Sequence, residues 1–574
     1  MFTKSRICFL LLFILSLEFP FDLLRAASDP NASEQAGSLE KELREREKNK
    51  RLEEIELPVI ESKVPEEEGA GLPETEFPIS SIKIIGNTFF KDDVFDPLKK
   101  PYEHQTSNLK KLKSLTKDIT SYYRMRGYVT SRAILPPQQL EQGSLTIQII
   151  EGKVGQIKIE GLKYSRESMI RNRFALKPGD ILRYQNLERS LVNLNANPDR
   201  TVRVVLLPGE KPETTDIVLK IEEKFPFHAN YGFNNLGTVS TGRLRESTSV
   251  SASNLLGIDD QFTSRIEIAE RRDFVGFSNS YLVPLDSRGD LLSFDFSRVN
   301  VELGKDLKPF NASGRALVFG PTFIFPFLQT KYLSGEWTSG FDFKRIRTIL
   351  GGRANSKDDL RVFKFGPNFI ENDKWGKTIL SNQFQFAIAG FLGGLGNNDP
   401  VASRREADGT FFQYNVTFGR LQNIWHDTQG VFRMSAQLTP HRLVPAQQFR
   451  LGGFDTVRGF PEGDYLGDYG FQGSFELRVP PYFIPQKIKW PATTIPIRDS
   501  VRCVGFVDFG RAFVSSPFPE EDKSRTLVGI GGGIRVSLAK NIQARVDWGV
   551  PVGRKSSQTN GGGTHLHFSL QVGF

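Results

Sequence analysis

The sequence of 574 residues predicts a mostly β protein, in which an N-terminal helix and two small α/β units precede a C-terminal transmembrane barrel of about sixteen antiparallel strands. The first observation is the alternation of apolar and polar residues from Phe225 onward, which ends in the aromatic strand Leu566–Phe574. The second is the even number of strand-like runs, and the third is a leader segment typical of exported proteins. The 47 Phe and 52 Gly, beside only 4 Met, fit the same fold class.

Residues 1–27 have the pattern of a signal peptide: basic residues first, then the apolar run Ile7–Leu17, then small residues at 26 and 27. This run is too short to span a membrane comfortably, and no later run approaches the roughly 20 apolar residues of a membrane helix. A mature chain that lies in a membrane must therefore cross it as a closed barrel.

Residues 28–56 predict a polar helix, because strong helix formers dominate 34–56 and opposite charges recur four positions apart, as at Glu40 and Arg44. Its few apolar residues form no wide face for packing against a core. At roughly 1.5 Å per residue, the helix-forming stretch 34–56 is about 35 Å long, close to the thickness of a bilayer. The segment is either a solvated spacer or a plug in a water-filled pore. Residues 57–76, rich in Pro, Glu and Gly, form a linker.

Composition and motifs argue against several classes of protein. The net charge of +9 is small for this length and no base-reading motif accompanies it, so we expect no nucleic-acid partner. Cys8 lies in the leader, which leaves Cys503 alone and rules out an intrachain disulfide. No helix follows Gly390–Gly396, so we expect no nucleotide. His565 and His567 share one face of the last strand, where lumenal polar residues are favoured over a metal site. We expect no metal, no cofactor and no catalytic residues.

The two units, residues 77–152 and 153–224, carry one pattern twice: a strand, two helical segments and two strands. In the first unit the strand is predicted over Ile79–Ile85 and the longer helix over Leu109–Arg126. In the second unit the strand is predicted over Gly155–Glu160. Neither unit contains a recognisable nucleophile, base and acid, so both are interpreted as binding or spacing modules.

Residues 225–574 form the predicted barrel. Apolar side chains on one face of each strand would contact lipid, and polar or small ones on the other would line a wet lumen, as Leu292–Phe296 illustrates. Short turns are predicted at one end and longer polar loops at the other, such as Gly351–Asp358 and Gly393–Gly409. Arg288-Gly289-Asp290 is interpreted as a hairpin turn rather than an adhesion motif.

The segment Phe449–Gly470 interrupts this pattern between two strand-like runs, Val431–Leu438 and Gln472–Val479. It carries six glycines and two arginines, Arg450 and Arg458. A long connection without its own period is usually functional or disordered, and its glycines favour a sharply folded hairpin. We therefore expect a folded loop inside the barrel lumen.

The two α/β units resemble tandem POTRA domains, both in the order of their elements and in their residues. The similar segments are GNTFF at Gly86–Phe90, YYRMRGYVTSRAILP at Tyr122–Pro136 and LKPGDILRYQNLERSLVNLN at Leu176–Asn195.

Two further motifs resemble those of the POTRA-plus-barrel superfamily. The lumenal loop motif VRGF consists of Val457, Arg458, Gly459 and Phe460. The barrel-wall motif FxDxG consists of Phe506, Asp508 and Gly510. In that superfamily the arginine pairs with the acidic residue of the strand motif, so the resemblance implies a salt bridge between Arg458 and Asp508. A guanidinium can bind a carboxylate through two parallel hydrogen bonds, and each charge would be costly to bury alone.

The order of the whole chain resembles two-partner secretion transporters (TpsB type), the haemolysin secretion/activation family. The resemblance implies an outer-membrane location with periplasmic POTRA domains, and export of a large exoprotein whose N-terminal secretion domain the POTRA pair binds. It also implies insertion into outer-membrane lipid by the barrel-assembly machinery, with Phe574 as the C-terminal assembly signal. The alternatives are an insertase that assembles other barrels and a general porin; an enzyme is not expected.

Overall fold

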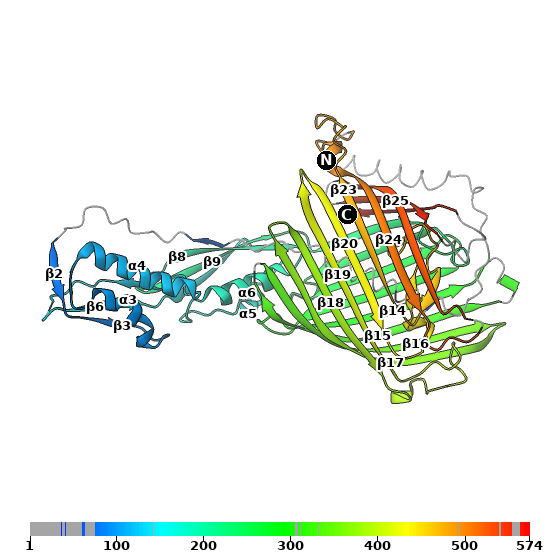
Figure 1. The fold of residues 1–574 in the computed structure, drawn as a ribbon, viewed down its shortest axis with the longest axis horizontal. Coiled ribbons are helices and arrows are strands. Elements are labelled where there is room, and N and C mark those ends of the chain that lie inside the picture. Colours follow the sequence, from blue (N-terminus) through cyan, green and yellow to red (C-terminus); the bar gives the residue numbers. More distant parts are fainter. Residues whose placement is uncertain are drawn as a thin grey trace.

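The computed structural model describes residues 36, 41, 60–62, 75–140, 142–304, 308–309, 311–330, 332–491, 493–519, 521–538, 541–553 and 563–574. The predicted signal peptide at 1–27, and most of the predicted helix at 28–56 and linker at 57–76, lie outside the described residues. Two small units extend in a row from one end of a barrel, as Figure 1 shows.

The first unit packs helices against a three-stranded sheet of order β3-β6-β5, in which β3 and β6 are parallel and β5 and β6 antiparallel. Its elements are β2 (Glu76–Ile79), β3 (Ser81–Ile85), η2 (Asp92–Phe95), α3 (Asp96–Lys99), η3 (Lys100–Tyr102), β4 (Gln105–Asn108), α4 (Leu109–Met125), β5 (Arg132–Ile134) and β6 (Ser144–Ile150). Helix α4 buries one apolar stripe, including Leu112, Leu115 and Ile119, against the sheet.

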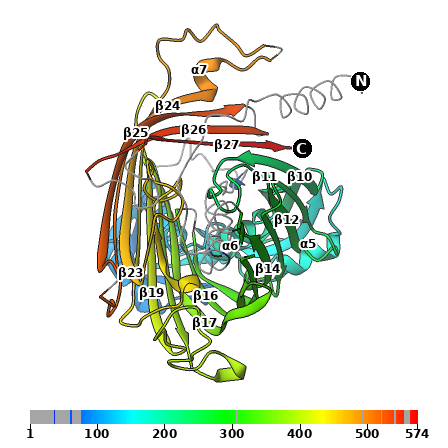
Figure 2. The same cartoon turned by 90° about the vertical axis from the view of Figure 1, so that its right-hand side faces the viewer.

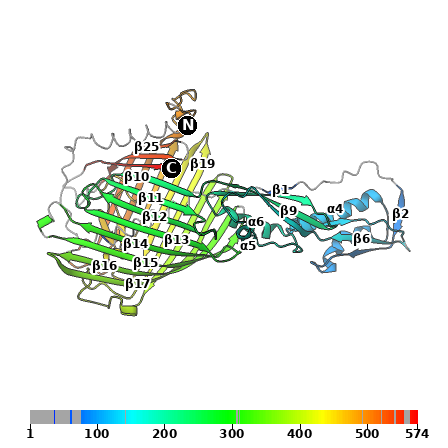
Figure 3. The same ribbon diagram turned by 180° about the vertical axis from the view of Figure 1, so that it is seen from behind.

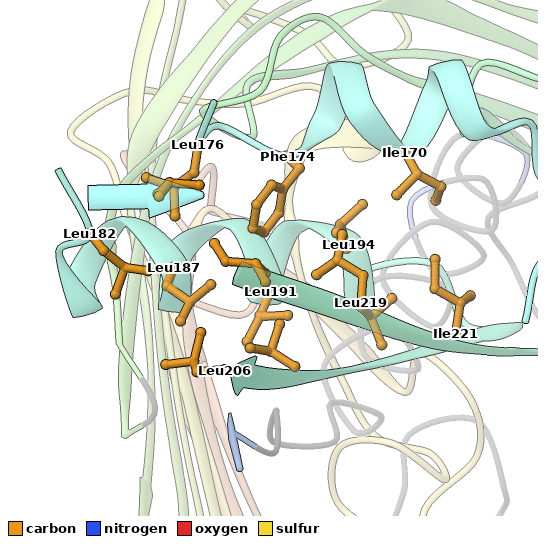
Figure 4. Packing of buried hydrophobic residues seen from close by; sticks show 14 of the residues in the cluster. Ile170, Phe174, Leu176, Leu182, Leu187, Leu191, Leu194, Leu206, Leu219 and Ile221 are labelled. Carbon is orange, nitrogen blue, oxygen red and sulfur yellow. The ribbon is translucent and has the colours of Figure 1, made fainter. Parts of the chain in front are cut away.

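The second unit repeats this plan. Its elements are β7 (Lys153–Glu160), α5 (Glu167–Arg173), α6 (Tyr184–Asn195), β8 (Arg200–Pro208) and β9 (Thr214–Glu223). Ile170 of α5, Leu191 of α6 and Leu219 of β9 meet in its core (Figure 4). The strand β1 (Ile60–Ser62) pairs in parallel with β8, so that a part of the predicted linker extends the sheet to the order β1-β8-β9-β7 (Figure 3).

Sixteen strands form a closed antiparallel barrel, in which β10 pairs with β27. They are β10 (Phe227–Asn234), β11 (Arg245–Ser253), β12 (Gln261–Ala269), β13 (Phe274–Pro284), β14 (Leu291–Glu302), β15 (Ser313–Gln329), β16 (Leu333–Leu350), β17 (Arg353–Asp373), β18 (Gly376–Ala387), β19 (Phe411–Trp425), β20 (Thr428–Leu438), β23 (Tyr469–Val479), β24 (Val501–Phe513), β25 (Ser524–Leu538), β26 (Ile542–Pro551) and β27 (His565–Gly573). The predicted strand number and fold class are confirmed.

The barrel wall follows the predicted alternation. Phe294 and Phe296 of β14 are exposed on the outer face, whereas Ser293 and Ser297 are buried. Outer apolar side chains face lipid and inner polar ones face the lumen, which suits a transmembrane barrel. Within the described chain, no helix is long and apolar enough to cross a membrane.

The connections differ from the prediction in two places. The expected loop Gly351–Asp358 is wrong, because β16 ends at Leu350 and β17 begins at Arg353; its polar residues continue the strands instead. Short turns are predicted at the barrel end that bears the two units. This prediction is wrong for β23 and β24, which are joined there by the long connection 480–500. Arg288-Gly289-Asp290 lies in the turn between β13 and β14.

Candidate functional site

The segment Phe449–Gly470 is a hairpin. Its short strands β21 (Phe449–Leu451) and β22 (Tyr465–Gly467) pair with each other. Arg450 crosses the hairpin to Glu462, with 2.5 Å between Nη2 and Oε2, and the Phe454 backbone N–H donates to the other Glu462 oxygen at 2.7 Å. Both contacts lie within the hairpin and join residues of its two arms.

The tip of the hairpin is buried against the inner wall. Val457 and Phe460 are fully buried in a cluster with Leu527 of β25. Gly459 has φ +98°, and a Cβ atom there would lie 2.9 Å from the backbone of Val550. Only glycine accommodates both the left-handed backbone and this close approach.

Arg458 binds Asp508 of β24 through three hydrogen bonds. Its Nε and Nη2 atoms donate to the two carboxylate oxygens at 2.7 Å each, and its backbone N–H donates at 3.0 Å. Both side chains are almost wholly buried, at 2% and 0% exposure. The structure therefore brings together the two residues whose pairing the motifs imply, in a bidentate geometry that fixes orientation as well as distance.

The remaining members of the barrel-wall motif support this pair. The guanidinium carbon of Arg458 lies 3.5 Å from the centre of the Phe506 ring, in a cation–π arrangement. At Gly510, a Cβ atom would lie 2.4 Å from a methyl group of Leu451 in the hairpin. Phe506 thus covers one face of the guanidinium, and Gly510 leaves room for the base of the loop.

The structure adds two acidic partners that the sequence analysis missed. Arg458 Nη1 lies 2.6 Å from Glu476 of β23 and 3.4 Å from Asp547 of β26. Arg458 Nη2 donates to Ser474 at 3.1 Å, and this hydroxyl donates to Asp508 at 2.6 Å. The sequence signal that could have revealed these two partners is a charged residue at a lumen-facing position of an alternating strand.

Three further arginines complete this charge cluster. Arg535 bridges Asp547 at 2.6 Å and Glu476 at 3.1 Å. Arg545 binds Asp547 at 2.7 Å, and Arg478 binds Glu476 at 2.9 Å. Since each buried carboxylate has arginine partners, the cost of removing these charges from water is offset by ion pairs.

Two described residues of the segment 28–56 also lie inside the barrel. Both have helical backbone conformation. Ala36 is buried among wall residues of β13 to β16, including Val301 and Ile346. The Lys41 ammonium donates to the side chain of Gln437 at 3.1 Å and to the backbone carbonyl of Gln448 at 3.1 Å.

Buried ion pairs connect the second α/β unit to the barrel. Asp259, in the turn between β11 and β12, lies 2.9 Å from Arg200 and 3.4 Å from Arg173. Arg173 also donates to the backbone carbonyl of Asp286 in the next turn at 2.6 Å. Asn193 of α6 donates to the carbonyl of Ser287 at 3.0 Å.

The other candidate residues, Phe574, His565 and His567, lie in or next to the last strand β27. Phe574 follows the last strand, where its N–H donates to the carbonyl of Ala229 at 2.8 Å. The rings of His565 and His567 are 6.1 Å apart, and that of His567 lies 5.9 Å from Phe454. Among the described residues, no group of three or more His, Cys, Asp or Glu is arranged to hold a metal ion.

Comparison with known proteins places this architecture in one family. The model of the haemolysin secretion/activation protein ShlB/FhaC/HecB matches residues 213–320 and 370–536. Residues 77–152 match the ShlB-type POTRA domain, and residues 153–224 match the POTRA model described as a surface antigen variable number repeat.

Individual relatives extend over most of the chain. The outer membrane transporter CdiB of Dickeya dadantii (strain 3937) is 25% identical over 78% of this chain and 78% of its own length. The heme/hemopexin transporter protein HuxB of Haemophilus influenzae (strain 86-028NP) is 21% identical over 71% of this chain and 73% of its own. The solved structure of CdiB from Escherichia coli has a TM-score of 0.75 at 21% identity, over 96% of this chain and 100% of that one. With its POTRA-like units, closed barrel and folded lumenal loop, the chain belongs to the haemolysin secretion/activation family.

Proposed function

We propose that the protein exports a large exoprotein across the bacterial outer membrane by two-partner secretion. The observation that carries this proposal is the match of POTRA units and barrel to one secretion family, with relatives whose names describe outer-membrane transporters. The barrel lies in the outer membrane and the POTRA units in the periplasm. Transport requires no catalytic residues in this chain, and folding of the exported protein outside the cell would supply the energy.

We assign residues 77–152 and 153–224 to the two POTRA domains and 225–574 to the barrel. In this arrangement the exoprotein's N-terminal secretion domain binds the POTRA pair before the chain enters the lumen. An extended chain can add a strand to an exposed sheet edge through backbone hydrogen bonds. The edge at β8 already holds β1 of the linker, so an exoprotein that uses it must displace β1.

We assign Arg458 and Asp508 to the anchoring of the lumenal loop. The VRGF tip touches three consecutive strands through Glu476, Asp508 and the backbone at Gly529, which keeps the loop against one wall. Residues 28–56 are assigned to a pore plug, because Ala36 and Lys41 contact the wall and the base of this loop.

Phe574 is assigned to recognition by the barrel-assembly machinery. The residue is 59% exposed at the strand that closes the barrel, where an assembly factor can reach it. A variant Phe574→Ala should accumulate as unassembled chain in the periplasm, whereas Phe225→Ala, another exposed phenylalanine, should assemble normally. Equal assembly of both variants would contradict this assignment.

The proposal is tested by deleting the gene and measuring both secreted proteins and total outer-membrane barrels. Secretion predicts the loss of one exoprotein from the medium, with other barrels at normal abundance. Broad loss of barrels would instead identify an insertase, and loss of small-solute permeability alone would identify a general porin.

A further inference from the structure

The described residues of the periplasmic connection 480–500 form a folded lobe with its own hydrogen bonds. The backbone N–H of Trp490 donates to the carbonyl of Ile495 at 3.1 Å, and that of Ile497 donates to Ile488 at 2.9 Å. The Trp490 indole N–H donates to the hydroxyl of Ser500 at 2.6 Å, at the end of α7 (Ile497–Ser500). We call residues 480–500 the periplasmic lobe.

The lobe is attached to the end of the neighbouring strands. The Tyr482 hydroxyl donates to the backbone carbonyl of His426, in the turn between β19 and β20, and lies 3.1 Å from the hydroxyl of Thr428. The guanidinium of Arg498 lies 4.7 Å from the centre of the Tyr482 ring. These contacts hold the lobe beside the periplasmic ends of β19 and β20.

The lobe presents apolar and basic side chains together. Phe483 is 81% exposed, and Ile488 is also exposed. Lys487 and Lys489 are exposed on either side of Ile488. Aromatic rings and lysines are the residues that anchor proteins at the boundary between lipid tails and headgroups.

The position of the lobe distinguishes lipid from other occupants. In Figure 2, the segment with α7 stands away from the outer side of β24, beyond the circumference of the barrel rather than over its lumen. Trp425, at the end of β19 beside the turn that Tyr482 contacts, is also exposed. An exported chain in the lumen would not meet this surface.

We propose that the periplasmic lobe lies in the headgroup region of the periplasmic leaflet, where Phe483 and Ile488 insert among the acyl chains and Lys487 and Lys489 bind anionic phospholipid. The lobe carries three basic residues and one acidic residue, so its charge complements a phosphate headgroup. It thereby anchors the periplasmic ends of β23 and β24, the strands that hold the lumenal loop. This inference does not depend on the exported substrate.

The first experiment measures the depth of Phe483 in the membrane. A fluorescent label is placed on Phe483→Cys, in a Cys503→Ser background, after reconstitution into vesicles of phosphatidylcholine and phosphatidylglycerol that contain spin-labelled lipid. The matched control is a label on Met125→Cys in POTRA 1, where the side chain is 78% exposed. We expect quenching at 483 and none at 125. Absence of quenching at 483 would overturn the proposal.

The second experiment tests the headgroup. The variant Lys487→Glu/Lys489→Glu should lower the ratio of phosphatidylglycerol to phosphatidylcholine that co-purifies with the protein, by about fivefold for each lysine. The control is Lys110→Glu/Lys111→Glu, two exposed lysines of α4. Barrel assembly is verified for each variant by its heat-dependent gel mobility. An unchanged lipid ratio would refute the headgroup assignment, and so would a photo-crosslinker at Ile488 that reacts with a second copy or with the exported protein instead of lipid.

Discussion

Removal of Arg458 should release the tip of the lumenal loop from the barrel wall. In Arg458→Ala, Asp508 loses both guanidinium hydrogen bonds and keeps the hydroxyl of Ser474. Glu476 and Asp547 lose one partner each but retain Arg535, which bridges them. Of the three buried carboxylates, Asp508 therefore loses the most hydrogen bonds to a guanidinium.

The expected free-energy cost of undocking follows from the burial of the ion pair between Arg458 and Asp508. Removing one partner of a buried ion pair costs about 3–5 kcal/mol, which corresponds to a rise of about 10²-fold to about 4 × 10³-fold in the population of the released loop. Asp508→Asn should cost less, because Arg458 keeps Glu476 at 2.6 Å. Arg458→Lys should fall between these two, because it keeps the charge but loses the bidentate geometry.

The assay measures the rate at which a maleimide labels Val457→Cys in a Cys503→Ser background, since Val457 is fully buried when the loop is docked. Arg450→Ala is the matched control, because Arg450 lies in the same hairpin and binds Glu462 across its base. We expect Arg458→Ala to label much faster than Arg450→Ala, and to lose secretion although its barrel assembles. Equal labelling rates would refute the anchoring geometry, and near-normal secretion by both Arg458→Ala and Asp508→Ala would refute its role in export.

Three further predictions concern other parts of the molecule. Asp259→Ala should loosen the attachment of POTRA 2 to the barrel, because it leaves two buried arginines without this carboxylate. The distribution of distances between a spin label on POTRA 2 and one on the barrel should then broaden. Asp273→Ala, which removes a more exposed ion pair, should leave that distribution unchanged. Burial raises the pKa of Glu223, but hydrogen bonds from Ser165 and from nearby backbone N–H groups outweigh it and hold the pKa below the ordinary value of 4.5. Glu223 therefore stabilises POTRA 2 above about pH 4.5 and loses this effect as the pH falls through its lowered pKa, so Glu223→Gln should speed hydrogen exchange around Ser165 at pH 7 and leave it unchanged in strong acid. Deletion of residues 28–56 should raise single-channel conductance, with Lys41→Glu giving a smaller rise; an unchanged conductance in the deletion would contradict the plug.

The sequence was sufficient for the fold because its signals are local. Alternation of apolar and polar residues with a period of two predicts strands such as β14, and helical spacing of apolar residues predicts α4. Neither pattern depends on residues that are distant in the sequence. The loop Gly351–Asp358 was mispredicted because its polar residues continue the long hairpin of β16 and β17, in which Ser356 pairs with Thr348 and Lys357 with Arg347.

The candidate site was predictable where a motif spans it and not elsewhere. The VRGF and FxDxG motifs implied the pair of Arg458 and Asp508, but Glu476 and Asp547 belong to strands whose register and separation only the closed barrel determines. Asp259 was missed for a related reason. Its partners lie on another domain, and nothing local in a turn specifies which surface it will meet.

The anchors of the loop and of POTRA 2 lie on different parts of the barrel wall. The loop tip is held by β23, β24 and β26, whereas POTRA 2 contacts the turns that follow β11 and β13. An exoprotein delivered by POTRA 2 would therefore enter beside the N-terminal strands, where Ala36 packs against the far ends of β13 to β16. If the exported chain passes along this wall, it would displace the segment that contains Ala36, which packs on strands other than those that hold Arg458. We therefore expect a disulfide between Ala36→Cys and Gly314→Cys, whose added Cβ would lie 3.0 Å from that of Ala36, to block secretion until it is reduced; secretion at the normal rate with this bond intact would show that the exported chain takes another path.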